Sequence, residues 1–319
     1  MQALSASSVT DFALWGGLVP GNVDRLGELA DAGVVGFKAF MAPSGIDDFE
    51  AADRQTLRAG MARAAELGLP VAVHAESPER LLPPAGSAWL DWARSRPVEA
   101  ELAAIDEALE VAAETGCSLH VVHVSSARGV RLVTEARARG VDATCETCPH
   151  YLLLCENDLD ALGPLGKCAP PIRSAAERHA LWDELRAGRI DLVASDHSPA
   201  PPSMKQGDDA FAVWGGISGC QSLLASLLGR LPAADVARLT AGAPAERLRL
   251  AAKGRIEPGA DADVALVRLG DAELTVDDLQ DRHRHNPYVG RTFGGRVVRT
   301  LVRGVDAAEP RGRLLRPAR

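Results

Sequence analysis

Residues 34–40 read VVGFKAF, an apolar run that carries one lysine, Lys38, near its end. A stretch rich in Ala, Leu and Arg follows at residues 53–67, and a second apolar run, VAVH, occupies residues 71–74. A strand, a helix and a second strand in this order predict one unit of a parallel sheet with a crossover helix. This part of the chain therefore indicates an α/β fold.

The same alternation extends in both directions from this unit. We expect further strands at residues 9–14, 119–124, 141–145 and 191–195, and further helices at 21–32, 98–115, 129–139 and 175–187. The sequence thus predicts six strand-and-helix units, and no glycine-rich dinucleotide fingerprint follows any of the strands, which weakens the case for an open Rossmann sheet. Because a closed (β/α)8 barrel needs eight strands, we expect a TIM-barrel-like fold that lacks its first two.

The pattern of alternating strands and helices ends after residue 252. Short β-prone segments follow, punctuated by Gly254, Pro258 and Gly259. Glycine and proline interrupt regular elements and mark turns. We therefore predict two parts, an incomplete barrel over residues 1–252 and a small β-sandwich portion over residues 253–319.

Composition and charge exclude several classes of function. The net charge of −8 argues against a nucleic-acid partner, since binding to a phosphate backbone needs clustered Lys and Arg. No apolar run approaches membrane-spanning length, and no targeting segment is evident at the start. Six scattered cysteines are typical of reduced thiols in an intracellular protein, so we expect a cytoplasmic location.

Four polar residues lie at the ends of predicted strands: Lys38, His74, His123 and Asp196. Barrel enzymes carry their reactive groups at such positions. Taken singly, a strand-end histidine is commonly structural and an aspartate before a loop is commonly a cap or turn residue. Lys38 is less ordinary, because a buried ammonium is costly unless it is paired or neutralised. Together the four provide neutral imidazoles, a carboxylate and a modifiable lysine, as metal-dependent hydrolysis would need.

The lysine can become an anionic ligand. Its ordinary pKa of about 10.4 leaves almost no free amine at pH 7, but desolvation and nearby cations favour the neutral form. The free amine can add carbon dioxide, and the resulting carbamate of Lys38 offers two oxygens that could bridge two divalent ions. By contrast, His120 lies three residues before His123, so we expect it on the opposite face of its strand in a structural role.

At these residues the chain resembles the amidohydrolase superfamily, in the cyclic-amidase branch that holds dihydroorotase, hydantoinase and allantoinase, and it is most similar to allantoinase. The segments that carry the resemblance are ALWGGLVPGN (13–22), GFKAF (36–40), VHAE (73–76), HVSS (123–126), TCETCPHY (144–151), KCAPPIR (167–173), SDHSPAPPSMK (195–205), WGGISG (214–219), KGRIEPGADADVALV (253–267) and RHRHNPYVGR (282–291). They span nearly the whole chain.

The resemblance implies a binuclear metal centre in a homo-oligomer, with a tetramer expected. Zinc is the expected metal, with cobalt or manganese as alternatives. The implied metal ligands are carboxylated Lys38, His74, His123 and Asp196, Asp196 also moves the catalytic proton, and the implied substrate contacts are Ala169, Ser198 and Gly215. The implied reaction opens the hydantoin ring of allantoin to give allantoate. The WGG and SDHSP segments favour this small cyclic amide over the substrates of dihydroorotase or hydantoinase, which stay open as alternatives.

One feature of the family is not matched. Its members open their barrel with a strand ending in H-x-H, which supplies two further metal ligands, and this strand and the next are absent here. We therefore expect a truncated enzyme that, made alone, binds fewer than two metals, aggregates and has little activity. The rival is a non-catalytic amidohydrolase-like subunit. Retention of Lys38 beside His74 and His123 argues against it, because a scaffold has no physical need for a buried lysine there.

Overall fold

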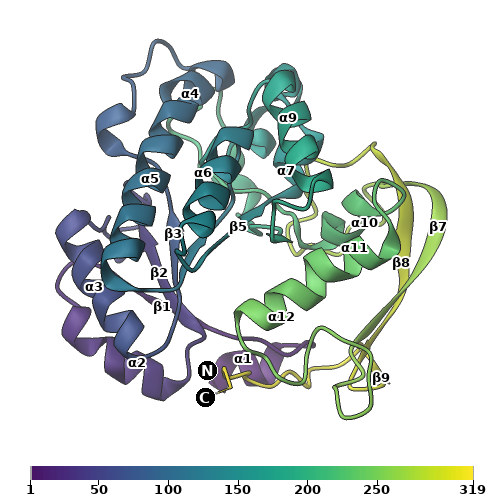
Figure 1. Ribbon diagram of the computed structural model, residues 1–319. Coiled ribbons are helices and arrows are strands. Elements are labelled where there is room, and N and C mark those ends of the chain that lie inside the picture. The colour runs from purple at the N-terminus through teal and green to yellow at the C-terminus, as the bar shows by residue number, and fades with distance from the viewer. Residues whose placement is uncertain (1, 319) are drawn as a thin grey trace.

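The computed structural model describes residues 2–318, and its main sheet is parallel with six strands in the order of the chain (Figure 1). The strands are β1 (Trp15–Gly17), β2 (Gly36–Phe40), β3 (Val71–His74), β4 (Leu119–Val121), β5 (Ala143–Thr147) and β6 (Leu192–Val193). Each consecutive pair is joined by a segment that contains at least one helix. The predicted α/β class and the six parallel strands are confirmed.

Five helices follow the strands and cover the outer side of the sheet (Figure 1). They are α2 (Leu26–Ala32), α3 (Arg54–Glu66), α5 (Val98–Thr115), α6 (Ala127–Ala138) and α9 (Ala175–Arg186). Three begin at a side-chain cap, in which Asp53, Ser126 or Ser174 accepts a hydrogen bond from the backbone N–H three residues later. Such caps satisfy an otherwise unpaired N–H of the first turn and define where the helix starts.

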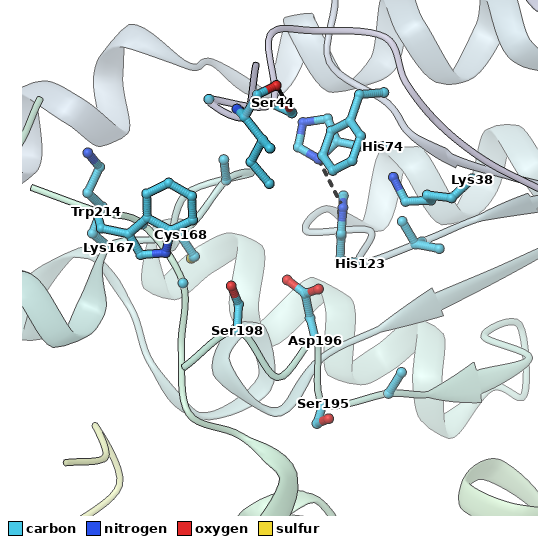
Figure 2. A pocket seen from close by; sticks show the side chains of 18 of the residues that line it. Lys38, Ser44, His74, His123, Lys167, Cys168, Ser195, Asp196, Ser198 and Trp214 are labelled. Atoms are coloured by element: carbon cyan, nitrogen blue, oxygen red, sulfur yellow. Dashed lines mark hydrogen bonds between the residues drawn. The ribbon is translucent and has the colours of Figure 1, made fainter. Parts of the chain in front are cut away.

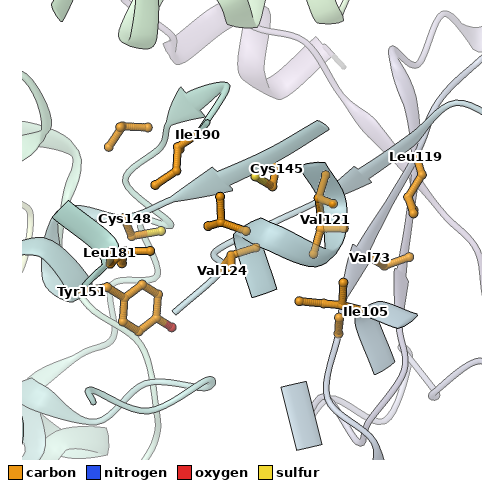
Figure 3. Packing of buried hydrophobic residues seen from close by; sticks show 14 of the residues in the cluster. Val73, Ile105, Leu119, Val121, Val124, Cys145, Cys148, Tyr151, Leu181 and Ile190 are labelled. Atoms are coloured by element: carbon orange, nitrogen blue, oxygen red, sulfur yellow. The ribbon is translucent and has the colours of Figure 1, made fainter. Parts of the chain in front are cut away.

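The core between the sheet and these helices consists mainly of small aliphatic side chains. Figure 3 shows Ile105 of α5 together with the strand residues Val73, Leu119 and Val121, all of them almost fully buried. Ala100, Ala104 and Ala108 of α5 are buried on the same helix, so that the helix can approach the strands closely. This packing holds the C-terminal ends of the strands in fixed relative positions.

The remaining helical segments are short. The α-helices are α1 (Gln2–Ser7), α4 (Trp89–Ser95), α7 (Pro149–Leu153), α8 (Leu159–Leu162), α10 (Leu223–Leu227), α11 (Ala233–Ala237) and α12 (Ala243–Arg247), with a π-helical turn, η7 (Arg238–Gly242), between the last two. The 3-10 turns are η1 (Val23–Arg25), η2 (Pro78–Arg80), η3 (Glu156–Asp158), η4 (Gly163–Gly166), η5 (Pro202–Lys205) and η6 (Cys220–Ser222). Within residues 2–318, no helix is long and apolar enough to cross a membrane.

The strand register brings polar residues of neighbouring strands together. Lys38 lies opposite Gly17 on β1 and opposite Ala72 on β3, and Phe40 lies opposite His74. Over the described residues, β1 and β6 each pair with one neighbour only, so the sheet has two open edges. The parallel arrangement collects the C-terminal ends of all six strands on one side of the molecule.

A second, antiparallel sheet is formed by β7 (Val264–Glu273), β8 (Thr292–Val302) and β9 (Val305–Asp306). In Figure 1, β7 and β8 form a long hairpin on the far side of α10 and α11 from the main sheet. The segment between these two strands returns to the main core, where Tyr288 is fully buried and Leu279 is 3% exposed. The tail of the chain therefore contributes both to a separate sheet and to the packing of the barrel part.

The strand predicted at residues 9–14 is wrong. Only Phe12 pairs there, in an isolated bridge with Leu314, and the first strand of the sheet is Trp15–Gly17. Asp11 is held by ion pairs with Lys253 and Arg303. These long-range contacts tie the segment to the other end of the chain instead of to the sheet, and the two described ends lie side by side in Figure 1.

Candidate active site

A cavity of about 1040 Å³ opens at the C-terminal ends of the strands. The four predicted metal ligands, Lys38, His74, His123 and Asp196, all line it (Figure 2). They come from β2, from the last residue of β3 and from the segments directly after β4 and β6. Polar groups that lie apart in the sequence thus meet in one cavity.

The two histidines lie in direct contact. His74 Nδ1 is 3.0 Å from His123 Nε2, and both side chains are buried. Burial lowers the pKa of His74, and burial together with the charges of His74 and Lys38 lowers the pKa of His123 well below its ordinary value. Both imidazoles are therefore neutral at pH 7, which is the form that binds a metal ion.

The backbone is strained at two of the predicted ligands. His123 and Asp196 both have a φ of 43°, and they are two of only five non-glycine residues with positive φ among residues 2–318. This left-handed conformation costs free energy for side chains other than glycine, and such strain collects at functional sites. In both cases the turn comes directly after a strand and aims the side chain into the cavity.

Lys38, which is half-buried, has no carboxylate within ion-pair distance among the described residues. Its Nζ donates to the carbonyl of Ala39 at 3.0 Å and lies 3.7 Å from the centre of the Phe40 ring. Within residues 2–318, no carboxylate oxygen forms an ion pair with it. Burial lowers the pKa of Lys38 to about 7, although the charges of Asp196 and Glu146 act in the opposite direction. Near neutral pH a large fraction of Lys38 is therefore free amine.

The pKa of Asp196 is shifted upward, in the opposite direction to that of Lys38. Burial, together with the charge of Glu146, raises the pKa of Asp196 to about 6, against the influence of Lys38. The residue is exposed, and it lines the cavity, where its carboxylate points toward His123 (Figure 2). In the described structure, no carboxylate oxygen of Asp196 forms a group with ring nitrogens of His74 and His123 in which all three atoms lie within 4.8 Å of one another. A carboxylic acid with a pKa near neutrality suits proton transfer.

The three predicted substrate contacts, Ala169, Ser198 and Gly215, also line the cavity. Their loops are joined by backbone hydrogen bonds: Gly216 N–H donates to the Lys167 carbonyl at 2.8 Å, and Ser198 N–H donates to the Ile217 carbonyl at 3.0 Å. Figure 2 shows Lys167, Cys168 and Trp214 on one side of the cavity and Lys38, His74 and His123 on the other. The loops thus form a wall that faces the candidate metal ligands.

Glycine is required at one position of this wall. Gly216 has a φ of 122°, and a Cβ there would lie 2.5 Å from the Ser198 carbonyl oxygen. Any other residue would be both strained and in collision with a backbone atom. The WGG segment therefore packs directly on the loop that follows Asp196.

The predicted position of His120 on the opposite face of its strand is wrong, because its side chain lines the same cavity as His123. β4 ends at Val121, and the positive φ of His123 interrupts the strand alternation on which that prediction rested. The structural role of His120 stays a prediction. His120 contacts Thr144 Oγ1 at 2.8 Å and Glu146 Oε2 at 3.1 Å. Glu146, which lines the cavity beside it, was not foreseen from the sequence either, although it lies in the TCETCPHY segment.

Lys205 is a further residue that the sequence did not single out. Its Nζ donates to three carbonyls, those of Pro164 at 3.1 Å, Trp214 at 3.0 Å and Gly216 at 2.7 Å. The side chain is only 9% exposed. One ammonium thus joins the loop at η4 to the WGG segment and shapes the wall of the cavity.

A second cluster of acidic groups lies away from this cavity. The carboxylates of Asp11, Asp261 and Asp263 converge within 4.8 Å of one another. Lys253 Nζ lies 2.5 to 2.8 Å from all three, and Arg303 also pairs with Asp11. The cluster is therefore an ion-pair network that joins Asp11, near the N-terminus, to residues 253–263 and Arg303.

Comparisons with known proteins agree on one family. The sequence pattern of the amidohydrolase family matches residues 20–306. An allantoinase of Rubrobacter xylanophilus is 52% identical over the whole chain, which covers 75% of that relative, and an allantoinase of Deinococcus radiodurans is 50% identical over 97% of the chain and 73% of its own length. Among solved structures, an L-hydantoinase from Arthrobacter aurescens superposes with a TM-score of 0.94 at 32% identity, covering 98% of this chain and 74% of that one.

Proposed function

Since the chain belongs to the amidohydrolase family, we propose that it hydrolyses the ring of a cyclic amide, allantoin in particular, to give allantoate. The observation that carries the proposal is the content of the cavity. Two neutral imidazoles 3.0 Å apart share it with a lysine whose pKa is about 7 and with Asp196, whose pKa is about 6. The names of the two relatives support allantoin as the substrate.

The donor set fits divalent metal ions. Neutral imidazoles and a carboxylate are ligands that zinc prefers, and cobalt or manganese can use the same set. Lys38, as a free amine, could add carbon dioxide and contribute an anionic carbamate beside His74 and His123. When bound, the ions would polarise the amide carbonyl and assist the attack of water.

Residues of the chain would transfer the proton and hold the substrate. Asp196 would take a proton from the attacking water and deliver it to the departing ring nitrogen, as its pKa near neutrality allows. Backbone groups at Ala169, Ser198 and Gly215 would hold the ring against the wall that faces the metal ligands.

A hydantoinase or dihydroorotase activity is the second candidate. The similarity to L-hydantoinase favours it, but at 32% identity, against 52% for the allantoinase of R. xylanophilus. A non-catalytic subunit is less well supported, because it would need neither the lowered pKa of Lys38 nor the strained backbone at His123 and Asp196. We further propose a cytoplasmic homo-oligomer, a tetramer, with a barrel part over residues 1–252 and a β-sandwich portion over residues 253–319.

Metal-dependent turnover tests this proposal. The protein, expressed from its complete coding sequence, should open allantoin after loading with zinc. A strong chelator should abolish the activity, and added zinc should restore it. A protein that opens the ring equally well after complete metal removal would contradict the proposed chemistry.

A further inference from the structure

A buried carboxylate lies behind one of the two histidines. Glu76 Oε2 is 2.7 Å from His74 Nε2, the ring nitrogen that faces away from His123. Glu76 is fully buried, and the Arg96 guanidinium donates to both of its oxygens, with Nη2 at 2.6 Å and Nε at 3.0 and 3.2 Å. Arg96 thus fixes the carboxylate, and the carboxylate contacts the imidazole.

The contact with this carboxylate decides which nitrogen of His74 carries hydrogen. Arg96 forms a buried ion pair with Glu76 and donates to both of its oxygens. A carboxylate that is ion-paired in this way has acceptors only, so His74 Nε2 is the donor. A neutral imidazole has one hydrogen, so Nδ1 is left with a lone pair, which accepts from His123 Nε2 when no metal is bound.

We propose that Glu76 is a positioning residue, which accepts the hydrogen of His74 Nε2 and so keeps Nδ1 unprotonated and aimed at the metal ion that the cavity would hold. This inference rests on the metal site of the proposed function. Partners of this kind orient metal-binding histidines, and their loss typically weakens metal binding by about 10–100-fold. Arg96 supports the arrangement by holding both carboxylate oxygens.

The same set of contacts continues to the other histidine. The backbone carbonyl of Arg96 accepts a hydrogen bond from Arg173 Nη1, and Arg173 Nε donates to Ser125 Oγ at 2.9 Å. Ser125 follows His123 by two residues, and its backbone N–H donates to Glu101 Oε1 at 2.7 Å. One buried network therefore contacts the His74 ring directly and anchors the segment that carries His123.

Zinc affinity, measured by competition with a chromophoric chelator, tests the role of Glu76. Glu76→Gln keeps the size of the side chain but removes the charge, and its amide can donate as well as accept, so the tautomer of His74 is no longer enforced. We expect zinc to bind about 10–100-fold more weakly than to the wild type. Glu184→Gln is the matched control, since Glu184 is 1% exposed, pairs with Arg131 and Arg189, and belongs to α9 and not to the residues that line the cavity. It should bind zinc as the wild type does.

The tautomer itself can be observed without metal. Nitrogen NMR of the histidine side chains in the metal-free protein should show His74, assigned by the signal lost in His74→Asn, protonated at Nε2 in the wild type and in Glu184→Gln. Glu76→Gln should show a mixture of tautomers. The inference is overturned if wild-type His74 is protonated at Nδ1, or if Glu76→Gln keeps wild-type zinc affinity. A wild type that holds His74 in the expected tautomer but binds no zinc would instead refute the metal site of the proposed function.

Discussion

The lowered pKa of Lys38 has a direct chemical consequence, which can be measured by labelling its amine. With an ordinary lysine pKa, roughly three molecules in ten thousand carry a free amine at pH 7. With a pKa of about 7, half of the molecules do. At pH 7, Lys38 of the metal-free protein should therefore carry about a thousandfold more free amine than an unshifted lysine.

The chain offers an internal reference for this measurement. It contains four lysines, and Lys253 is held by Asp11, Asp261 and Asp263, whose hydrogen bonds outweigh burial and raise the pKa of its ammonium. Trace acetic anhydride would be added to metal-free, bicarbonate-free protein at a series of pH values. Mass spectrometry of the peptides would then report the acetylated fraction at Lys38 and at Lys253.

The shape of the pH profile decides the outcome. Labelling of Lys38 should rise about tenfold between pH 6 and pH 8 and then level off, because the amine is by then almost entirely free. Labelling of Lys253 should stay low and keep rising tenfold per pH unit. If Lys38 also keeps rising up to pH 10, its pKa is not lowered. The basis for a carbamate at this position would then be lost.

Three further perturbations follow from the same contacts. In bicarbonate-free buffer, the free energy of unfolding of the metal-free wild type should rise relative to that of Lys38→Met between pH 7 and pH 9, by at most about 1.4 kcal/mol per pH unit. The reason is that the unfolded state then binds one proton more than the folded state. If the urea midpoints of the two proteins change with pH in the same way, the prediction is wrong. Lys205→Met should lower the free energy of unfolding by about 3 kcal/mol, because three carbonyls lose their donor, and an unchanged denaturation midpoint would disprove that role. Gly216→Ala should lower the free energy of unfolding by about 1–3 kcal/mol and raise KM. Gly215→Ala should cost little stability, because its Cβ would come no closer than 3.9 Å to Lys167. Equal losses of stability in the two variants would refute the argument from the Ser198 contact.

Local pattern was enough to predict most of the fold. The alternation of apolar runs with helical stretches identified β2 to β6 near their observed positions, because each strand is buried and each helix follows its strand directly. The first strand failed for a physical reason. Phe12 pairs with Leu314, about three hundred residues away, and a pairing of that range leaves no mark in the local sequence.

The site was predictable where strand ends carried polar residues. Lys38, His74, His123 and Asp196 share one cavity because parallel strands gather their C-terminal ends. The sequence did not indicate residues that support the site by contacting another side chain or a loop. Arg96 reaches Glu76 from twenty residues further along the chain, and the three carbonyls bound by Lys205 belong to two separate loops. Neither arrangement has a spacing that could have indicated it.

The identity of the ring that is opened is the most direct test of the account. The zinc-loaded protein, expressed from its complete coding sequence, should be assayed side by side on allantoin, dihydroorotate and unsubstituted hydantoin, with kcat/KM measured for each. We predict that allantoin has the highest kcat/KM, and that His123→Asn abolishes its turnover. A higher kcat/KM for dihydroorotate or hydantoin would contradict the proposed function, and so would the absence of turnover on all three by a fully metal-loaded protein.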